Sequence, residues 1–187
     1  MQVKGVKRVG RARVLRGSLL ALCWLCLCPL AGAAGKAHQH GVAHLDVAVD
    51  GLRVSLELDT PLDNLIGFER APRTDAERDK ANAAIAKLRA GETLFRIDAA
   101  AGCTLDKVEL RSAPLLLGPP ATTSADHADL NAVYTFTCKA AAKAGFVEVG
   151  LFEAFAGLKR IDLQVATPKG QLKATLRRPS SRVVLAR

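Results

Sequence analysis

The four histidines are the residues of this sequence best suited to chemistry, because imidazole is the commonest metal ligand at neutral pH. Three of them fall within seven residues, and the fourth lies in a later loop beside two aspartates. In an extended segment, the even separations of His38, His40 and His44 place the three rings on one side of the chain. The predicted ligands are His38, His40, His44, His127, Asp126 and Asp129.

Nitrogen and oxygen donors in this number suit Zn²⁺, and an open site would also accept Cu²⁺ or Ni²⁺. The spacing does not match a closed structural zinc pattern such as C-x-x-C followed by H-x-x-x-H. Two interpretations therefore stay open. One is a metal site near the amino terminus, and the other is a polar tail whose histidines are incidental.

Motifs of catalysis are missing from the sequence, which has no Gly-rich phosphate loop, G-x-S-x-G turn or H-E-x-x-H helix. No nucleophile with an adjacent base is visible, so we expect a binding protein rather than an enzyme. One polar cluster, Asp63, Asn64 and Glu69, stands inside the apolar segment 61–73. Such residues often bond their own backbone, and the alternative is a partner-binding loop.

The first 33 residues have the pattern of a targeting signal. Basic residues and no acidic ones occupy positions 4–16, an apolar stretch follows at 18–31, and Ala31-Gly32-Ala33 suits a signal peptidase. The apolar stretch is shorter than the roughly 20 residues of a membrane span. We therefore predict a cleaved signal peptide at 1–33, a single periplasmic domain at 34–187, and no stable membrane anchor after cleavage.

Cleavage changes the charge of the protein. It removes six of the 27 basic residues, which leaves 21 basic against 18 acidic side chains and a net charge of +3. So small a net charge does not favour nucleic acid or an anionic membrane as partner. Cleavage after Gly35 instead of Ala33 would leave Lys36-Ala37-His38 at the amino terminus, where the amine, two amides and the imidazole can surround Cu²⁺ or Ni²⁺.

Only two of the five cysteines, Cys103 and Cys138, follow the predicted signal. An even pair in a compartment that permits disulfides predicts a structural bridge. The two cysteines are also the outer ends of two apolar segments of equal length, 103–112 and 129–138. Antiparallel pairing that places the cysteines opposite each other keeps both apolar faces aligned only if one bulge lies near Asp106-Lys107.

The remaining elements follow from periodicity. Alternating apolar residues predict one hairpin around Asp50-Gly51, a second between 161 and 176, and a strand at 146–149. Thr74-Asp75-Ala76-Glu77 is a capping box that begins a helix ending at about Ala90. The predicted fold class is α+β: an antiparallel sheet of hairpins with one main covering helix and one disulfide.

Several segments, in order along the chain, resemble a known protein family. They are HQHGVAHLDVAVDG, TPLDNLIGFERAPRTDAE, Cys103, HADLNAVYTFTC and GLFEAFAGLKRIDLQVATPKGQ. The family is the ZrgA type, zinc-regulated and zinc-binding periplasmic proteins of Gram-negative bacteria, and the resemblance covers nearly all of residues 34–187. It implies a periplasmic protein that binds zinc and supports zinc acquisition beside an ABC-type zinc importer or its binding protein.

The sequence departs from the family pattern at two places. Many members carry a long His/Asp-rich insertion where this chain has the short segment 118–126, which contains no histidine. Members also commonly carry a histidine after the GFE motif, where this chain has Arg70. Two hypotheses result: a zinc-binding accessory protein for zinc acquisition or homeostasis, or a disulfide-stapled envelope module that binds a protein partner through the segment 61–73 without physiological metal.

Overall fold

The computed structural model describes residues 39–119 and 128–185 of the chain. The signal predicted at 1–33 and the candidate ligands His38, Asp126 and His127 lie outside these residues. Over these residues the fold is mostly β, with 47% strand in nine strands and two sheets against 24% helix. The predicted α+β class is therefore wrong, although the main helix and the disulfide of that prediction are present.

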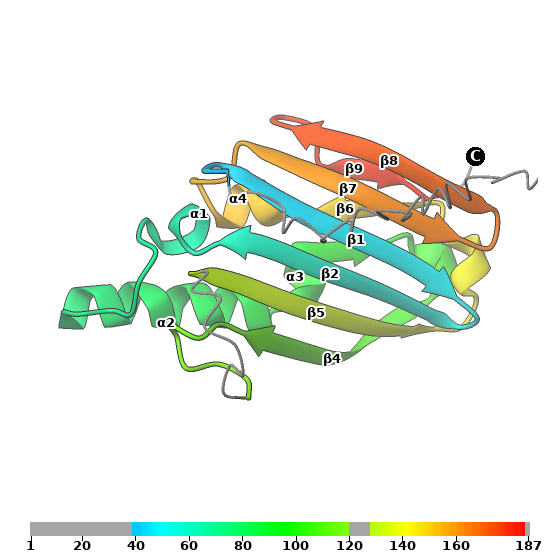
Figure 1. Ribbon diagram of the computed structural model, residues 1–187. Coiled ribbons are helices and arrows are strands. Elements are labelled where there is room, and N and C mark those ends of the chain that lie inside the picture. The colour runs from blue at the N-terminus through cyan, green and yellow to red at the C-terminus, as the bar shows by residue number, and fades with distance from the viewer. Residues whose placement is uncertain (1–38, 120–127, 186–187) are drawn as a thin grey trace, which may run out of the picture. The chain divides into compact units, whose positions relative to one another are not determined.

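Six strands form the large sheet, in the order β4-β5-β2-β1-β7-β8 (Figure 1). Their bounds are β1 Val42–Asp50, β2 Arg53–Pro61, β4 Cys103–Arg111, β5 Asp129–Cys138, β7 Arg160–Thr167 and β8 Gly170–Arg177. The small sheet, in the order β3-β6-β9, contains β3 Phe95–Ile97, β6 Phe146–Val149 and β9 Arg182–Val184. The α-helices are α1 Asp63–Ile66, α2 Asp75–Arg89, α3 Gly91–Leu94 and α4 Leu151–Ala154, and the 3-10 helices are η1 Ala99–Ala101 and η2 Ala141–Lys143.

The large sheet is mixed rather than antiparallel, because β1 pairs in parallel with β7. Hairpin patterns predict only neighbours joined by short turns, whereas the chain between β1 and β7 includes five other strands and all four α-helices. The strands of the small sheet are three or four residues long. A period-two pattern of that length is hard to distinguish from a loop, which explains why the second sheet was not predicted.

The first hairpin was predicted correctly except at its turn. Asp50 pairs with Arg53, so Gly51 and Leu52 form a two-residue turn in which Gly51 has a φ of 57°. Leu52, an apolar residue of this turn, is 61% exposed. Because the turn has two residues, the side chains that face the core are odd-numbered in β1 and even-numbered in β2.

The register of β4 and β5 confirms the predicted bulge and disulfide. Cys103 lies opposite Cys138 and is bonded to it, and Leu105 lies opposite Phe136. The register then shifts between Leu105 and Lys107, which returns the next apolar residues of β4 to the face that carries Tyr134. One inserted residue therefore keeps both ends of β4 packed against the core.

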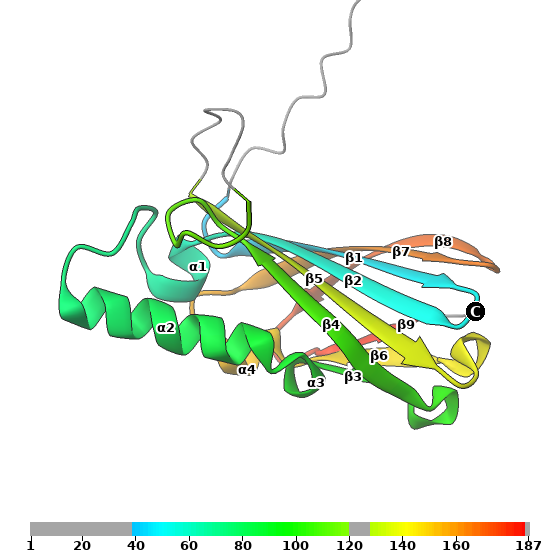
Figure 2. The same ribbon diagram turned by 90° about the horizontal axis from the view of Figure 1, so that it is seen from below.

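One face of the large sheet carries the core. Figure 2 shows α2 and the small sheet on the same side of it. Thr74 caps α2 by accepting a hydrogen bond from the Glu77 amide at 3.2 Å, and Ala81, Ala84 and Leu88 are buried in the shared core. Among the described residues, no helix is long and apolar enough to cross a membrane.

Candidate functional site

The start of β1 is held against α1 by one buried amide side chain. Asn64, only 2% exposed, accepts a hydrogen bond from the Gly41 amide at 2.5 Å. Its own NH₂ group donates to the Val42 carbonyl at 2.8 Å and to the Thr60 hydroxyl at 3.0 Å. Asn64 lies in the first turn of α1 and hydrogen-bonds both the start of β1 and the end of β2. It therefore holds three segments of the chain together.

Local sequence explains why α1 stands at this place. Leu62 and Ile66, four residues apart, are fully buried and orient the short helix on the core. Gly67 ends it in the left-handed conformation, with its amide bonded to the Asp63 carbonyl at 2.8 Å. Behind Asn64, Gly157 packs so closely that a Cβ there would lie 2.5 Å from the Asn64 carbonyl oxygen. The helix is thus confined between β1, β2 and the loop before β7.

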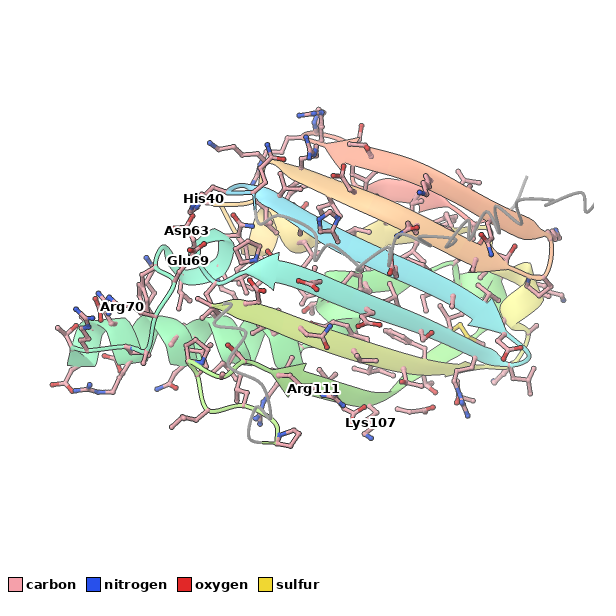
Figure 3. The ribbon with its side chains drawn as sticks, in the orientation of Figure 1. His40, Asp63, Glu69, Arg70, Lys107 and Arg111 are labelled. Carbon is pink, nitrogen blue, oxygen red and sulfur yellow. A yellow bond between two sulfur atoms is a disulfide. The ribbon has the colours of Figure 1, made fainter. Side chains whose placement is uncertain are left out.

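Asp63 and Glu69 face His40 from the α1 side (Figure 3). His40 Nδ1 lies 2.6 Å from Asp63 Oδ2 and 4.0 Å from Glu69 Oε1. The His40 side chain is 74% exposed, whereas the Asp63 side chain is only 32% exposed. We call His40, Asp63, Asn64 and Glu69 the His40 corner.

The His40 corner has the electrostatics of a metal-binding imidazole. The pKa of His40 is raised above its ordinary value of 6.5 by the hydrogen bond to Asp63, by the negative charge of Asp63 and by the negative charge of Glu69. When Nδ1 donates to Asp63, the ring is fixed in one tautomer and Nε2 keeps its lone pair. A ligating histidine in metalloproteins has this arrangement, with a carboxylate on the other ring nitrogen. The corner can therefore present one oriented nitrogen donor to a metal ion.

Arg70 clamps the loop that carries Glu69 onto α2. Its guanidinium donates to both carboxylate oxygens of Glu77 at 2.8 and 2.6 Å and lies 5.0 Å from the centre of the Phe68 ring. Glu77 also accepts from the Arg73 amide at 2.7 Å. Mainly through Arg70, these bonds lower the pKa of Glu77 to about 2. Arg70 thus has a structural role and binds Glu77 rather than His40.

His40 and His44 do not share a face of one strand, contrary to the extended conformation assumed from their spacing. His40 is in a turn, and Gly41, at a φ of 81°, precedes the first residue of β1. His44 lies within β1 on the outer face of the large sheet, between Asp59 of β2 and Asp162 of β7. The structure therefore groups His40 with Asp63 and Glu69, and places His44 in a different environment.

The other candidate ligands are at or just before the start of β5 in the sequence. Asp129 pairs with Pro61 at the end of β2, and the Leu62 amide donates to the Ala128 carbonyl at 2.8 Å. The start of β5 therefore lies beside Leu62, the residue that precedes Asp63. His127 and Asp126 directly precede this point in the sequence but belong to the segment that the structure does not describe.

Within residues 39–119 and 128–185, no group of three or more His, Cys, Asp or Glu side chains could by itself hold a metal ion. Any metal at the His40 corner would need ligands beyond those residues, or water. The pairing of His40 with Asp63 was not predicted, because the two residues are 23 positions apart. The one available signal was the presence of three polar residues inside the apolar segment 61–73.

The comparisons with known proteins show the family of the chain. A family model described as ZrgA family zinc uptake protein matches residues 37–185, which includes every residue of the His40 corner. No curated protein matches the chain.

Proposed function

The chain belongs to the ZrgA family of zinc uptake proteins, and from this premise we propose that it is a periplasmic zinc-binding accessory protein in which His40 is the principal ligand. It acts by holding and releasing the ion rather than by catalysis. The observation that carries the proposal is the 2.6 Å contact between His40 Nδ1 and Asp63 Oδ2. That contact orients the ring and leaves Nε2 as the nitrogen that binds zinc.

Two further ligands are proposed from their positions in the sequence. His38 is two residues before His40, and His127 is one residue before Ala128, whose carbonyl bonds the Leu62 amide. Three imidazoles and a water molecule would complete a tetrahedral zinc shell with one exchangeable position. An open position suits a protein that passes zinc to an ABC-type importer or to its binding protein, which we propose as the partner.

Calorimetric titration of the mature protein with zinc at pH 7.5 tests the proposal. Replacing His40 with alanine removes the oriented ligand, and we expect zinc affinity to fall by more than tenfold. Replacing His127 should have a smaller effect, because the segment 118–126 before it is short and contains no other histidine. His44→Ala is the matched control, since it removes an imidazole three residues after Gly41 and should leave the affinity within about twofold. Equal affinities for the wild type and the His40 variant would contradict the proposal.

The dependence of zinc binding on pH isolates the role of Asp63. Only neutral imidazole binds zinc, and Asp63 raises the pKa of His40. As the pH is lowered, zinc binding by the wild type should therefore begin to weaken before the pH reaches 6.5. In Asp63→Asn the pKa of His40 moves back toward its ordinary value, so the loss should begin at lower pH, while affinity at pH 7.5 falls about tenfold because the ring is no longer oriented. Identical pH profiles would show that Asp63 does not act through His40.

A further inference from the structure

The outer face of the large sheet is not covered by any described helix or strand, because α2 and the small sheet both lie on the other side (Figure 2). The register places outward side chains of successive strands in rows. One row contains, from β5 to β8, Val133, Glu57, Asp46, Gln164 and Lys173. The next row contains Thr135, Ser55, Ala48, Ala166 and Gln171. On β2, β1, β7 and β8 the side chains of the second row are shorter than those of the first.

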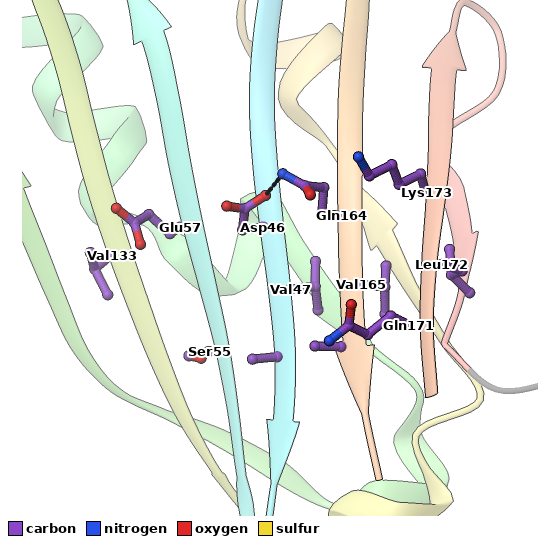
Figure 4. Close-up of a pocket in the computed structure, with 12 residues that line it drawn as sticks. Asp46, Val47, Ser55, Glu57, Val133, Gln164, Val165, Gln171, Leu172 and Lys173 are labelled. Atoms are coloured by element: carbon purple, nitrogen blue, oxygen red, sulfur yellow. Dashed lines mark hydrogen bonds between the residues drawn. The ribbon is translucent and has the colours of Figure 1, made fainter. Parts of the chain in front are cut away.

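The difference in side-chain size creates an open hollow of about 530 Å³ on this face (Figure 4). Ala48, Ser55 and Ala166 form its floor, and Val133 adds an apolar side. Asp46 and Glu57 stand directly opposite each other at its edge. The hollow therefore combines a floor of small side chains with two neighbouring carboxylates, separate from the His40 corner.

The two carboxylates are an electrostatic cost to the isolated protein, since like charges directly opposite each other destabilise a sheet. Each carboxylate accepts a hydrogen bond from a neutral amide: Gln164 Nε2 donates to Asp46 Oδ1 at 3.3 Å, and Asn131 Nδ2 donates to Glu57 Oε1 at 2.9 Å. Among the described contacts, no lysine or arginine forms an ion pair with either one. The amides orient the carboxylates without neutralising them.

Cationic side chains are found at the margins of the same face. Lys107 and Arg111 are on the edge strand β4, and Lys173 and Arg177 are on the edge strand β8. These edge-strand cations flank the two central carboxylates, although Lys107 is already paired with Glu109 of its own strand at 3.0 Å and Lys173 lines the hollow. A second copy stacked on this face about a two-fold axis through its centre would set Asp46 and Glu57 against the same residues of its partner, so charge excludes that arrangement.

We propose that this face docks a different protein through an arginine on an extended segment of the partner. The aliphatic part of the arginine would lie on Ala48 and Ala166. Its guanidinium would reach Asp46 and Glu57, because the planar fork can donate to two carboxylates at once. This docking site is independent of the zinc proposal, since none of its residues belongs to the His40 corner.

A short peptide probe tests the docking chemistry on the mature protein. The probe is an acetylated and amidated eight-residue peptide of alternating arginine and alanine, which places all arginines on one side when extended. Titrated into the ¹⁵N-labelled protein at low salt, it should shift the amide signals of Asp46, Ala48, Ser55 and Glu57. In the Asp46→Asn/Glu57→Gln variant, which keeps the side-chain shapes, peptide affinity should fall at least tenfold.

A matched variant controls for general charge. Asp75→Asn/Asp79→Asn removes the same two charges from α2 and should leave peptide affinity within twofold. The proposal is overturned if both double variants lose affinity equally, if the shifted signals lie on another face, or if signals of this face shift with protein concentration alone, which would identify a second copy. Zinc affinity measured on Asp46→Asn/Glu57→Gln should equal that of the wild type, so failure of docking and failure of the zinc proposal give different results.

Discussion

Replacing Asn64 with alanine is expected to lower the free energy of unfolding by about 2–4 kcal/mol, and to weaken zinc binding as well. The alanine leaves the buried Gly41 amide without its acceptor and the Val42 carbonyl without the Asn64 donor. Each unsatisfied buried group costs about 1–3 kcal/mol. The start of β1 would then be less firmly placed, and His40, one residue before Gly41, would lose its fixed position beside Asp63.

Urea unfolding of the mature protein measures this loss. Asn82→Ala is the matched control, because Asn82 is exposed on α2 and its replacement should change stability by no more than about 0.5 kcal/mol. Asn64→Asp should be at least as destabilising as Asn64→Ala, since it keeps the acceptor for the Gly41 amide but buries a carboxylate against the Val42 carbonyl. A stability of Asn64→Ala within 0.5 kcal/mol of the wild type would mean that the Asn64 bonds do not anchor β1.

The second large effect concerns the bond between Cys103 and Cys138. The bonded residues are 35 positions apart, and on the chain-entropy account closing a loop of that length stabilises the folded state by about 3–4 kcal/mol. Cys103→Ala/Cys138→Ala should therefore unfold at a clearly lower urea concentration, and the reduced wild type should behave like the variant. Two free thiols in periplasmic material, found by mass spectrometry under non-reducing conditions, would contradict the bond.

The alternation of apolar and polar residues along each segment predicted part of the fold correctly. The bulge between Leu105 and Lys107 and the pairing of Cys103 with Cys138 follow from which residues of two neighbouring segments are apolar. The parallel pairing of β1 with β7 does not, because it depends on where the chain returns after forming the small sheet. Period-two patterns specify which face of a strand is buried but not which strand lies beside it.

The same distinction applies to the candidate site. Spacing alone predicted His40 as a ligand and singled out Asp63, Asn64 and Glu69 as polar residues in an apolar segment. It could not join the two sets, because their contact depends on the turn at Gly41 and on α1 standing beside the entry of β1. Asn64 bonds the backbone of a segment more than 20 residues away rather than its own turn. Long-range contacts of this kind leave no periodic signal.

The most direct test of the central claim is a crystal structure of the mature protein with zinc, with diffraction measured on both sides of the zinc absorption edge. The account predicts an anomalous peak about 2.0–2.1 Å from His40 Nε2, with Asp63 still bonded to Nδ1. A peak bound by His44 and the neighbouring Asp59 instead, or full zinc occupancy at any site that leaves His40 Nε2 without metal, would contradict it.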